Sequence, residues 1–249
     1  MLFNELIRER RDPKGNTDRL MTPKPRTVNQ FLQHIRSFFE YEIRKDHIHR
    51  NPMRHIRNLR TERPFPEYYT QDELQRFFAL EMPIAYRNAF LALLHTGMRF
   101  AELANLSWED IDLHGKLLHV RSKSDFKTKT HNAERAIPIN DTLLQVIQSL
   151  DPQRNAKSVV FTSPLGRKLR AQSLLDVCKK YMLRADVHSR AYLHKFRHTF
   201  ATHLVQQGTM LESIKELLGH STIRETEVYA HNRGDHLHDD VRVLDALMS

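Results

Sequence analysis

Five side chains suited to phosphate chemistry are spread over residues 99–229. Arg99 stands in the segment TGMRFAEL, His194 and Arg197 in HKFR, and His220 and Tyr229 in LGHSTIRETEVYAH. Attack on a phosphodiester requires positive charge on the non-bridging oxygens, groups that exchange protons, and a nucleophile in line with the leaving oxygen. Two guanidiniums, two imidazoles and a phenol supply these functions if the fold brings them together.

The spacing of these residues favours a shared site. His194 and Arg197 are three residues apart, which puts them at neighbouring positions on one helix face. We expect His220 at the start of a turn and Tyr229 on the short helix that follows, both facing one pocket. Arginine suits the phosphate clamp because its planar fork stays charged. A phenol, with an ordinary pKa of about 10, is a weak nucleophile until a base or nearby cations help it ionise.

A lysine-rich segment, SKSDFKTKTHNAER, offers a proton donor for the leaving oxygen. Its three hairpin lysines are Lys123, Lys127 and Lys129. Lysine suits this role because neighbouring groups can lower its pKa. As an isolated feature, the segment fits a solvated loop better than a catalytic one.

Each of the other candidates also has a structural explanation. Tyr229 alone fits a half-buried packing residue, and Arg99 alone fits a cap for the carbonyls at a helix end. His194 and His198 are four apart, as in a zinc-binding helix, but Lys195 stands where the metalloprotease motif requires glutamate. We therefore expect no metal site.

Hydrophobic periodicity predicts a mainly helical fold with a small antiparallel sheet (α+β). Apolar residues at helical spacing predict helices over 27–46, 83–97, 171–185 and 192–208, and Thr70 with Glu73 predicts a capping box that opens another helix. Short apolar patterns predict strands at 116–121, 134–139 and 158–161. The proline-containing segment 61–69 predicts a linker. We therefore expect a helical segment over 1–64 and a second domain over 65–249.

The charge distribution favours a polyanionic partner. The 249 residues carry a net charge of +9, and residues 1–64 hold 15 Lys and Arg against 8 Asp and Glu. Arg36, Arg44 and Lys45 lie on the predicted helix of this basic segment and are candidates for DNA contact. No apolar run is long enough for a membrane span, and the chain starts with charged and polar residues, so we expect a soluble cytoplasmic protein. The single cysteine, Cys178, excludes disulfides within the chain and fits a core position.

Three motifs in a fixed order carry a resemblance to a known family. TGMRFAEL, LHKFRHTFATHL and LGHSTIRETEVYAH together resemble the catalytic domain of the tyrosine recombinase (phage integrase) family over residues 65–235. Upstream, the segment TVNQFLQHIRSFFEYEIRKDHIHRNP is similar to the later helices of that family's core-binding domain. The basic segment would then be a short, partial core-binding domain that grips DNA, because it has room for fewer helices than is usual in the family.

The resemblance implies a role for each candidate. Arg99 and Arg197 would grip the scissile phosphate, His194 would act in proton transfer, and His220 would hydrogen-bond a phosphate oxygen. Tyr229 would attack and leave a 3′-phosphotyrosyl link with a free 5′-hydroxyl. Glu102 would support the site. The family's hairpin lysine would protonate the leaving oxygen, and we favour Lys129, then Lys127, with Lys123 last and assigned to DNA contact.

The resemblance also implies partners and excludes cofactors. It implies a site-specific DNA recombinase or integrase of a mobile element or a chromosome that needs neither metal nor ATP. It further implies double-stranded DNA as substrate and a homotetramer on paired sites. The family also allows an accessory DNA-bending protein as a partner, and the protein would be associated with the nucleoid. The C-terminal segment 235–248 would pack either on a neighbouring protomer or on its own domain. The alternatives are a type IB topoisomerase-like relaxer or resolvase, and a DNA-binding remnant without catalysis.

Overall fold

The computed structural model describes residues 23–61, 65–124, 126–127, 134–150 and 155–232. The chain divides into two compact units, and the division falls between Pro64 and Phe65. Each unit is described by itself. Within the described residues, no helix combines the length and the apolar character that a membrane span requires.

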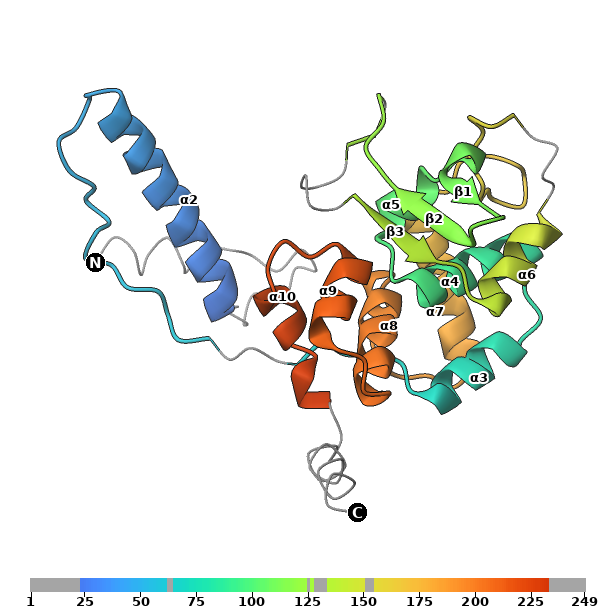
Figure 1. Cartoon of the computed structure of the whole chain (residues 1–249). Coiled ribbons are helices and arrows are strands. Elements are labelled where there is room, and N and C mark those ends of the chain that lie inside the picture. Colours follow the sequence, from blue (N-terminus) through green and yellow to red (C-terminus); the bar gives the residue numbers. More distant parts are fainter. Residues whose placement is uncertain (1–22, 62–64, 125, 128–133, 151–154, 233–249) are drawn as a thin grey trace, which may run out of the picture. The chain divides into compact units, whose positions relative to one another are not determined.

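The described part of the first unit is built on one long helix, α2 (Pro25–Arg44), which begins and ends two residues before the helix that the sequence predicts over 27–46 (Figure 1). Pro25 opens the helix, a position that suits proline because its missing N–H has no partner there in any helix. Asn51 ties the following segment to the helix by donating to the Arg36 carbonyl, at 3.2 Å, and to a Glu40 carboxylate oxygen, at 2.7 Å. Leu32 is buried.

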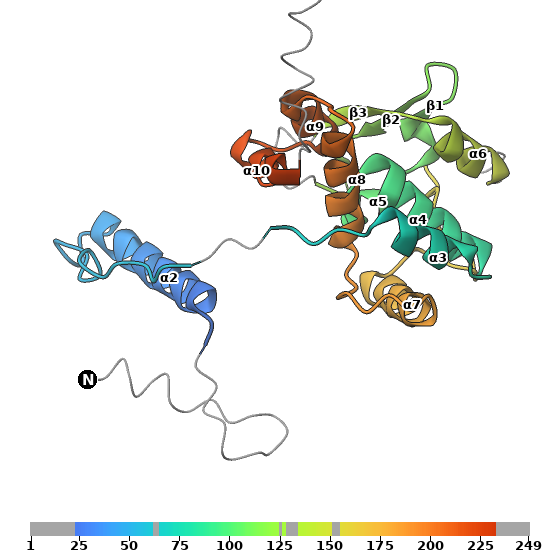
Figure 2. The same ribbon diagram turned by 90° about the horizontal axis from the view of Figure 1, so that it is seen from below.

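The second unit is mostly helical, as the sequence predicts. Its helices are α3 (Gln71–Ala79), α4 (Ile84–Thr96), α5 (Phe100–Ala104), α6 (Asp141–Ser149), α7 (Ala171–Arg184), α8 (His194–Gln206), α9 (Leu211–Leu218) and α10 (Arg224–Glu227), with 3₁₀ turns η1 (Trp108–Asp110) and η3 (Ala230–Asn232). The predicted capping box opens α3: Thr70 Oγ1 accepts from the Glu73 amide, and the Glu73 carboxylate accepts from the Thr70 amide. Helix α4 is central and packs against α8, α6 and α5 (Figure 2).

A three-stranded antiparallel sheet lies beside these helices, in the order β1 (Ile111–Asp112), β2 (Leu117–Val120), β3 (Arg135–Pro138). Leu118 pairs with Ile137 across β2 and β3, and both side chains are buried. The strand predicted at 158–161 is wrong. That segment makes only an isolated bridge from Val159 to Ser107, and its apolar character reflects the burial of Val160 and Phe161. The sheet instead contains β1, a strand that the sequence did not predict because it is too short to leave a pattern.

Aromatic rings fill the middle of the main core. Phe77 meets Phe90 edge-on with ring centroids 5.3 Å apart, and Phe90 stacks on Phe196 of α8 at 5.4 Å. Cys178 is fully buried beside the Tyr69 hydroxyl, in agreement with the core position expected for it. A second, smaller cluster joins α8 to α9 and includes Tyr229. The phosphate-chemistry residues lie on the elements that these two clusters hold together.

Candidate active site

Arg197 is fixed inside the unit by two helix ends. Its Nη1 donates to the Gly97 carbonyl and its Nη2 to the Leu218 carbonyl, both at 2.8 Å. Gly97 ends α4 in the left-handed conformation, with φ +61°, which glycine adopts without strain. Only 1% of Arg197 is exposed, and its Nε has no hydrogen-bond partner among the described residues. Burial and the neighbouring Arg99 lower its pKa to about 9, so the guanidinium remains charged at neutral pH.

Arg99 is positioned by the predicted supporting residue Glu102. One carboxylate oxygen of Glu102 accepts from Arg99 Nη1 at 2.9 Å, and the other accepts from the Arg99 backbone N–H at 2.9 Å. The second oxygen also accepts from Arg135 Nη2 at 2.9 Å. Burial alone would raise the pKa of Glu102, but the two arginines outweigh it and hold that pKa below its ordinary value. The carboxylate is therefore ionised between two guanidiniums.

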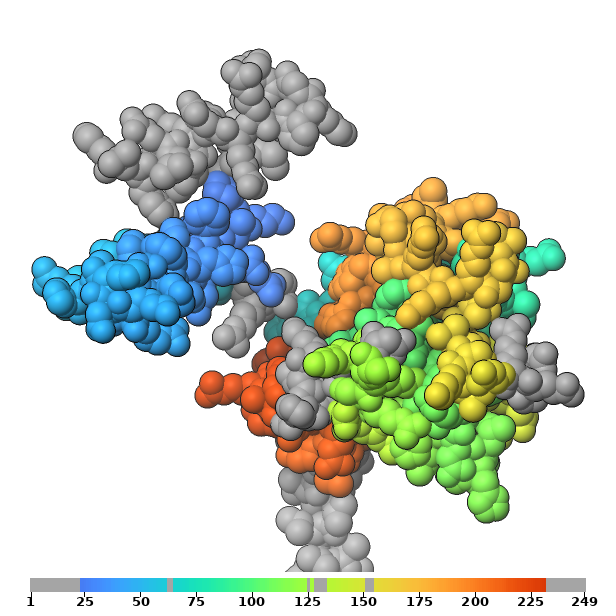
Figure 3. Space-filling model, turned by 90° about the horizontal axis from the view of Figure 1, so that it is seen from above, coloured from blue at the N-terminus to red at the C-terminus, as the bar shows by residue number. Residues whose placement is uncertain are grey.

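Arg135 links this pair to the rest of the site. It comes from β3, and its Nε donates to the Leu217 carbonyl of α9 at 2.6 Å. Strand β3 lies next to α9, and Figure 3 shows the green hairpin segment beside the orange-red C-terminal segments on this face. Two arginines, Arg135 and Arg197, thus bind consecutive carbonyls at the end of α9, just before His220.

The predicted histidines converge on the same arginines. His194 opens α8 and reaches solvent; partial burial, then Arg197 and Arg99, then His220 lower its pKa. His220 is buried, and its Nδ1 lies 2.9 Å from Thr226 Oγ1. Burial and Arg197 lower the pKa of His220 to about 4. Both imidazoles are therefore neutral at neutral pH. No group of three potential metal ligands occurs among the described residues, and this includes the surroundings of His194 and His198.

Tyr229 lies between α10 and η3, not on the helix where the sequence places it, because α10 ends at Glu227. Its ring is 2% exposed and packs in the smaller core cluster. Its hydroxyl lies 2.7 Å from Nδ1 of His198 on α8. Burial raises the pKa of Tyr229 to about 12, against the opposing effect of Arg197, so the phenol is protonated at neutral pH.

The hairpin lysines have different environments. Lys129, the first choice for the proton donor, lies outside the described residues, and Lys127 is exposed. Lys123 points into the unit: its ammonium donates to Ser107 Oγ at 2.6 Å and pairs with the buried carboxylate of Asp110. This contact occupies the ammonium that the sequence analysis assigned to DNA.

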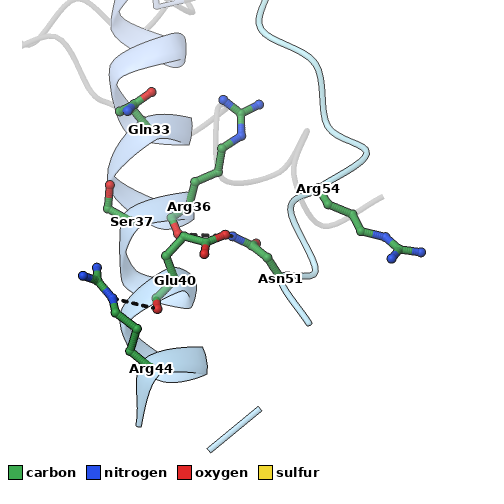
Figure 4. Close-up of a pocket in the computed structure, with 7 residues that line it drawn as sticks. All are labelled: Gln33, Arg36, Ser37, Glu40, Arg44, Asn51 and Arg54. Atoms are coloured by element: carbon green, nitrogen blue, oxygen red, sulfur yellow. Dashed lines mark hydrogen bonds between the residues drawn. The ribbon is translucent and has the colours of Figure 1, made fainter. Parts of the chain in front are cut away.

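The three basic residues proposed for DNA contact in the first unit also differ. Arg36 donates to Asn58 Oδ1 at 2.7 Å and to the Ile56 carbonyl, so its guanidinium joins two parts of this unit. Arg44 Nε makes a long contact with the Glu40 carbonyl, at 3.4 Å, and Lys45 lies over the Tyr41 ring. Arg36 and Arg44 are among the polar residues that line a hollow between α2 and the segment after it (Figure 4).

Comparison with known proteins places this arrangement in a family. The Phage integrase family matches residues 67–236, which contain all the catalytic candidates. The chain belongs to this family. Tyrosine recombinases XerC and XerD of Oceanobacillus iheyensis are 30% and 31% identical to it over 228 and 217 residues. These alignments cover 86% and 82% of this chain, and 72% and 71% of the relatives.

Solved structures share the integrase fold. The Tn1549 transposon integrase in complex with a circular intermediate DNA has a TM-score of 0.71 at 22% identity, covering 88% of this chain and 79% of that one. A lambda integrase dimer bound to a COC′ core site has a TM-score of 0.67 at 19% identity, covering 85% and 75%. As a member of the integrase family, the chain is a site-specific DNA recombinase of the tyrosine type.

Sequence reasoning missed two residues of this integrase site. Arg135 alternates with Ile137 and Ile139, so a charged residue stands on the apolar face of a strand, and that pattern signals a buried ion pair. His198 was considered only as a zinc ligand. Its position one turn after His194 could have indicated a contact with the same site.

Proposed function

We propose that the chain cuts and rejoins duplex DNA at specific sites through a covalent bond between Tyr229 and the 3′ phosphate. The observation that carries this proposal is the position of Arg197. Its two carbonyl partners belong to Gly97, two residues before Arg99, and to Leu218, two residues before His220. His198, the next residue on α8, bonds the Tyr229 hydroxyl. One buried cation thus ties together the three motifs.

The scissile phosphate binds at the guanidiniums of Arg99 and Arg197. Arg197 still has an unpartnered Nε–H among the described contacts, and about a quarter of the Arg99 side chain is exposed to solvent. Fixed cations stabilise the charge that builds up on the non-bridging oxygens as the phosphorus becomes five-coordinate, and they need no reorganisation to do so. Glu102 orients Arg99, since its carboxylate accepts hydrogen bonds from both the side chain and the backbone of that residue.

The remaining residues break the DNA strand and transfer protons. The oxygen of Tyr229 attacks the phosphorus, the bond to the 5′ oxygen breaks, and a hairpin lysine protonates that oxygen. His220 donates a hydrogen bond to a phosphate oxygen, and His194, which is exposed at the start of α8, takes part in proton transfer at the phosphate. Attack by the 5′-hydroxyl of another strand reverses the chemistry and rejoins DNA. The phosphotyrosyl bond conserves the energy needed for joining.

DNA exchange between two sites requires more than one protomer. We propose a homotetramer on paired sites, with the first unit supplying basic contacts through Arg44 and Lys45, which lie near the end of α2. Binding is then dominated by phosphate contacts and falls steeply with salt. Plasmids with two sites, in direct and inverted orientation, separate recombination from relaxation, because only recombination changes the order of the segments.

A nicked suicide substrate tests the chemistry. When the 5′-hydroxyl fragment diffuses away, cleavage cannot reverse and the protein stays attached to DNA. We expect a covalent adduct with the wild-type chain and none with Tyr229→Phe, whereas Tyr192→Phe, a control tyrosine that lies before α8, retains it. Tight DNA binding without any adduct would indicate a non-catalytic binding protein and refute the proposal.

A further inference from the structure

The hydroxyl of Tyr229 is held by a residue outside the predicted catalytic set. It lies 2.7 Å from Nδ1 of His198, and the two ring centroids are 5.8 Å apart. The tyrosine itself is buried in one hydrophobic cluster with Val205 of α8 and with Ile214 and Leu218 of α9. The position of the hydroxyl is therefore determined by packing, and the hydrogen bond is not a contact between two mobile side chains.

The protonation states define the direction of this hydrogen bond. Burial, with His194 and Arg197, lowers the pKa of His198 to about 4, so its imidazole is neutral. The phenol is protonated as well. A phenol is a stronger acid than the N–H of a neutral imidazole, so Tyr229 donates and Nδ1 accepts. The proton of the imidazole ring is then on Nε2.

We propose that His198 is the general base that accepts the Tyr229 proton during strand cleavage. This assignment rests on the proposed function. As the phenolic oxygen forms its bond to phosphorus, its proton moves to Nδ1 of His198, and the bond to the 5′ oxygen breaks with protonation of that oxygen by a hairpin lysine. Rejoining runs in reverse: the bond from phosphorus to Tyr229 breaks, and the imidazolium returns its proton to the phenolic oxygen.

The timing of the proton transfer follows from the two pKa values. Burial raises the pKa of Tyr229 and lowers the pKa of His198, so both shifts disfavour a separated phenolate and imidazolium. They therefore favour proton transfer during the attack over proton transfer before it. Once the oxygen shares its electrons with phosphorus, its proton becomes strongly acidic, and a base of intermediate pKa at hydrogen-bonding distance can take it.

The surroundings of His198 favour different roles for the two histidines of α8. His194 lies one turn earlier, and its ring is edge-on to the His198 ring with the centroids 4.8 Å apart. The centroid of the Tyr192 ring lies 6.2 Å from that of His198. Arg197 opposes positive charge on both imidazoles, and Arg99 also opposes it on His194. The negative charge of the bound phosphate offsets that effect in the transition state. His194 is then left to act on the phosphate oxygens.

The test is single-turnover cleavage of the suicide substrate by His198→Asn. Asparagine places an acceptor oxygen near the position of Nδ1 but cannot take a proton at neutral pH. We expect cleavage at least about 100-fold slower than wild type, with DNA affinity and unfolding temperature retained. His203→Asn is the matched control, because His203 lies on the same helix with its Nε2 3.2 Å from the Tyr69 carbonyl oxygen, and it should cleave at the wild-type rate.

A more acidic nucleophile distinguishes proton transfer from positioning. Tyr229 is replaced by a tyrosine fluorinated on both sides of the hydroxyl, in the wild-type and His198→Asn backgrounds. Because an acidic phenol needs less help from a base, we expect fluorination to restore cleavage by His198→Asn at least tenfold and to change the wild-type rate little. If His198→Asn cleaves normally, or if fluorination leaves it equally slow, His198 is not the base, and the proposed function stands. If the wild-type chain forms no adduct, the proposed function fails first.

Discussion

Replacing Glu102 with glutamine tests the network that positions Arg99. The variant keeps the shape of the side chain but removes the negative charge between Arg99 and Arg135, whose side chains are 25% and 6% exposed. Removing one partner of a buried ion pair costs about 3–5 kcal/mol, because the remaining charge is left uncompensated. One kcal/mol shifts the unfolding temperature of a domain of this size by about 2–4 °C. We therefore expect Glu102→Gln to lower it by about 10 °C.

The pH dependence of the stability provides a second, independent test of this prediction. The pKa of Glu102 in the folded chain lies below its ordinary value of 4.5, so the carboxylate contributes stability above that pH. The contribution is lost as the pH falls from 4.5 through the folded value. The difference in stability between wild type and Glu102→Gln should therefore be full at pH 7 and shrink as the pH falls below 4.5.

Thermal unfolding followed by circular dichroism at several pH values measures both effects. Glu212→Gln is the matched control, because Glu212 is an exposed glutamate on α9, and it should unfold within about 1 °C of wild type. Equal unfolding temperatures for Glu102→Gln and Glu212→Gln, or a difference that does not depend on pH, would refute the reasoning that the two arginines need this carboxylate.

Three further predictions concern backbone, leaving group and DNA contact. Gly97→Ala puts a Cβ 2.5 Å from a Phe200 carbon and should unfold at a clearly lower temperature than Gly166→Ala, which has a similar positive φ but open space around it. Alanine at the hairpin lysine that protonates the 5′ oxygen should slow cleavage of ordinary DNA but not of DNA with sulfur at that position, since a thiolate leaves without a proton; equal slowing of both substrates would contradict this. Arg44→Ala should reduce the slope of log affinity against log salt by about 0.9, and an unchanged slope would exclude a phosphate contact.

The sequence was sufficient to predict the secondary-structure elements whose apolar residues recur at a regular spacing. Helices α2, α4, α7 and α8 were predicted because their apolar residues recur at helical spacing, and Thr70 with Glu73 marked the start of α3. Helices α5, α6 and α9 were not predicted. Strand β1 was not, because two residues cannot show an alternation. Segment 158–161 was misassigned because the burial of Val160 and Phe161 produces the same short apolar run as a strand does.

The candidate site was predictable in its residues and not in its contacts. The motif order identified Arg99, His194, Arg197, His220 and Tyr229, but motifs carry no information on which groups touch. The bonds from Arg197 to two helix ends depend on how α4 and α9 meet α8, which is a tertiary property. The hydrogen bond between His198 and Tyr229 likewise joins residues 31 positions apart.

The identity of the attacking atom tests the central claim most directly. After a suicide substrate is trapped, the adduct is digested with protease and nuclease, and the peptide that carries the nucleotide is sequenced by mass spectrometry. We predict a nucleotide joined through its 3′ phosphate to Tyr229, with a free 5′-hydroxyl on the released fragment. A nucleotide on any other residue, or one joined through a 5′ phosphate, would contradict the account.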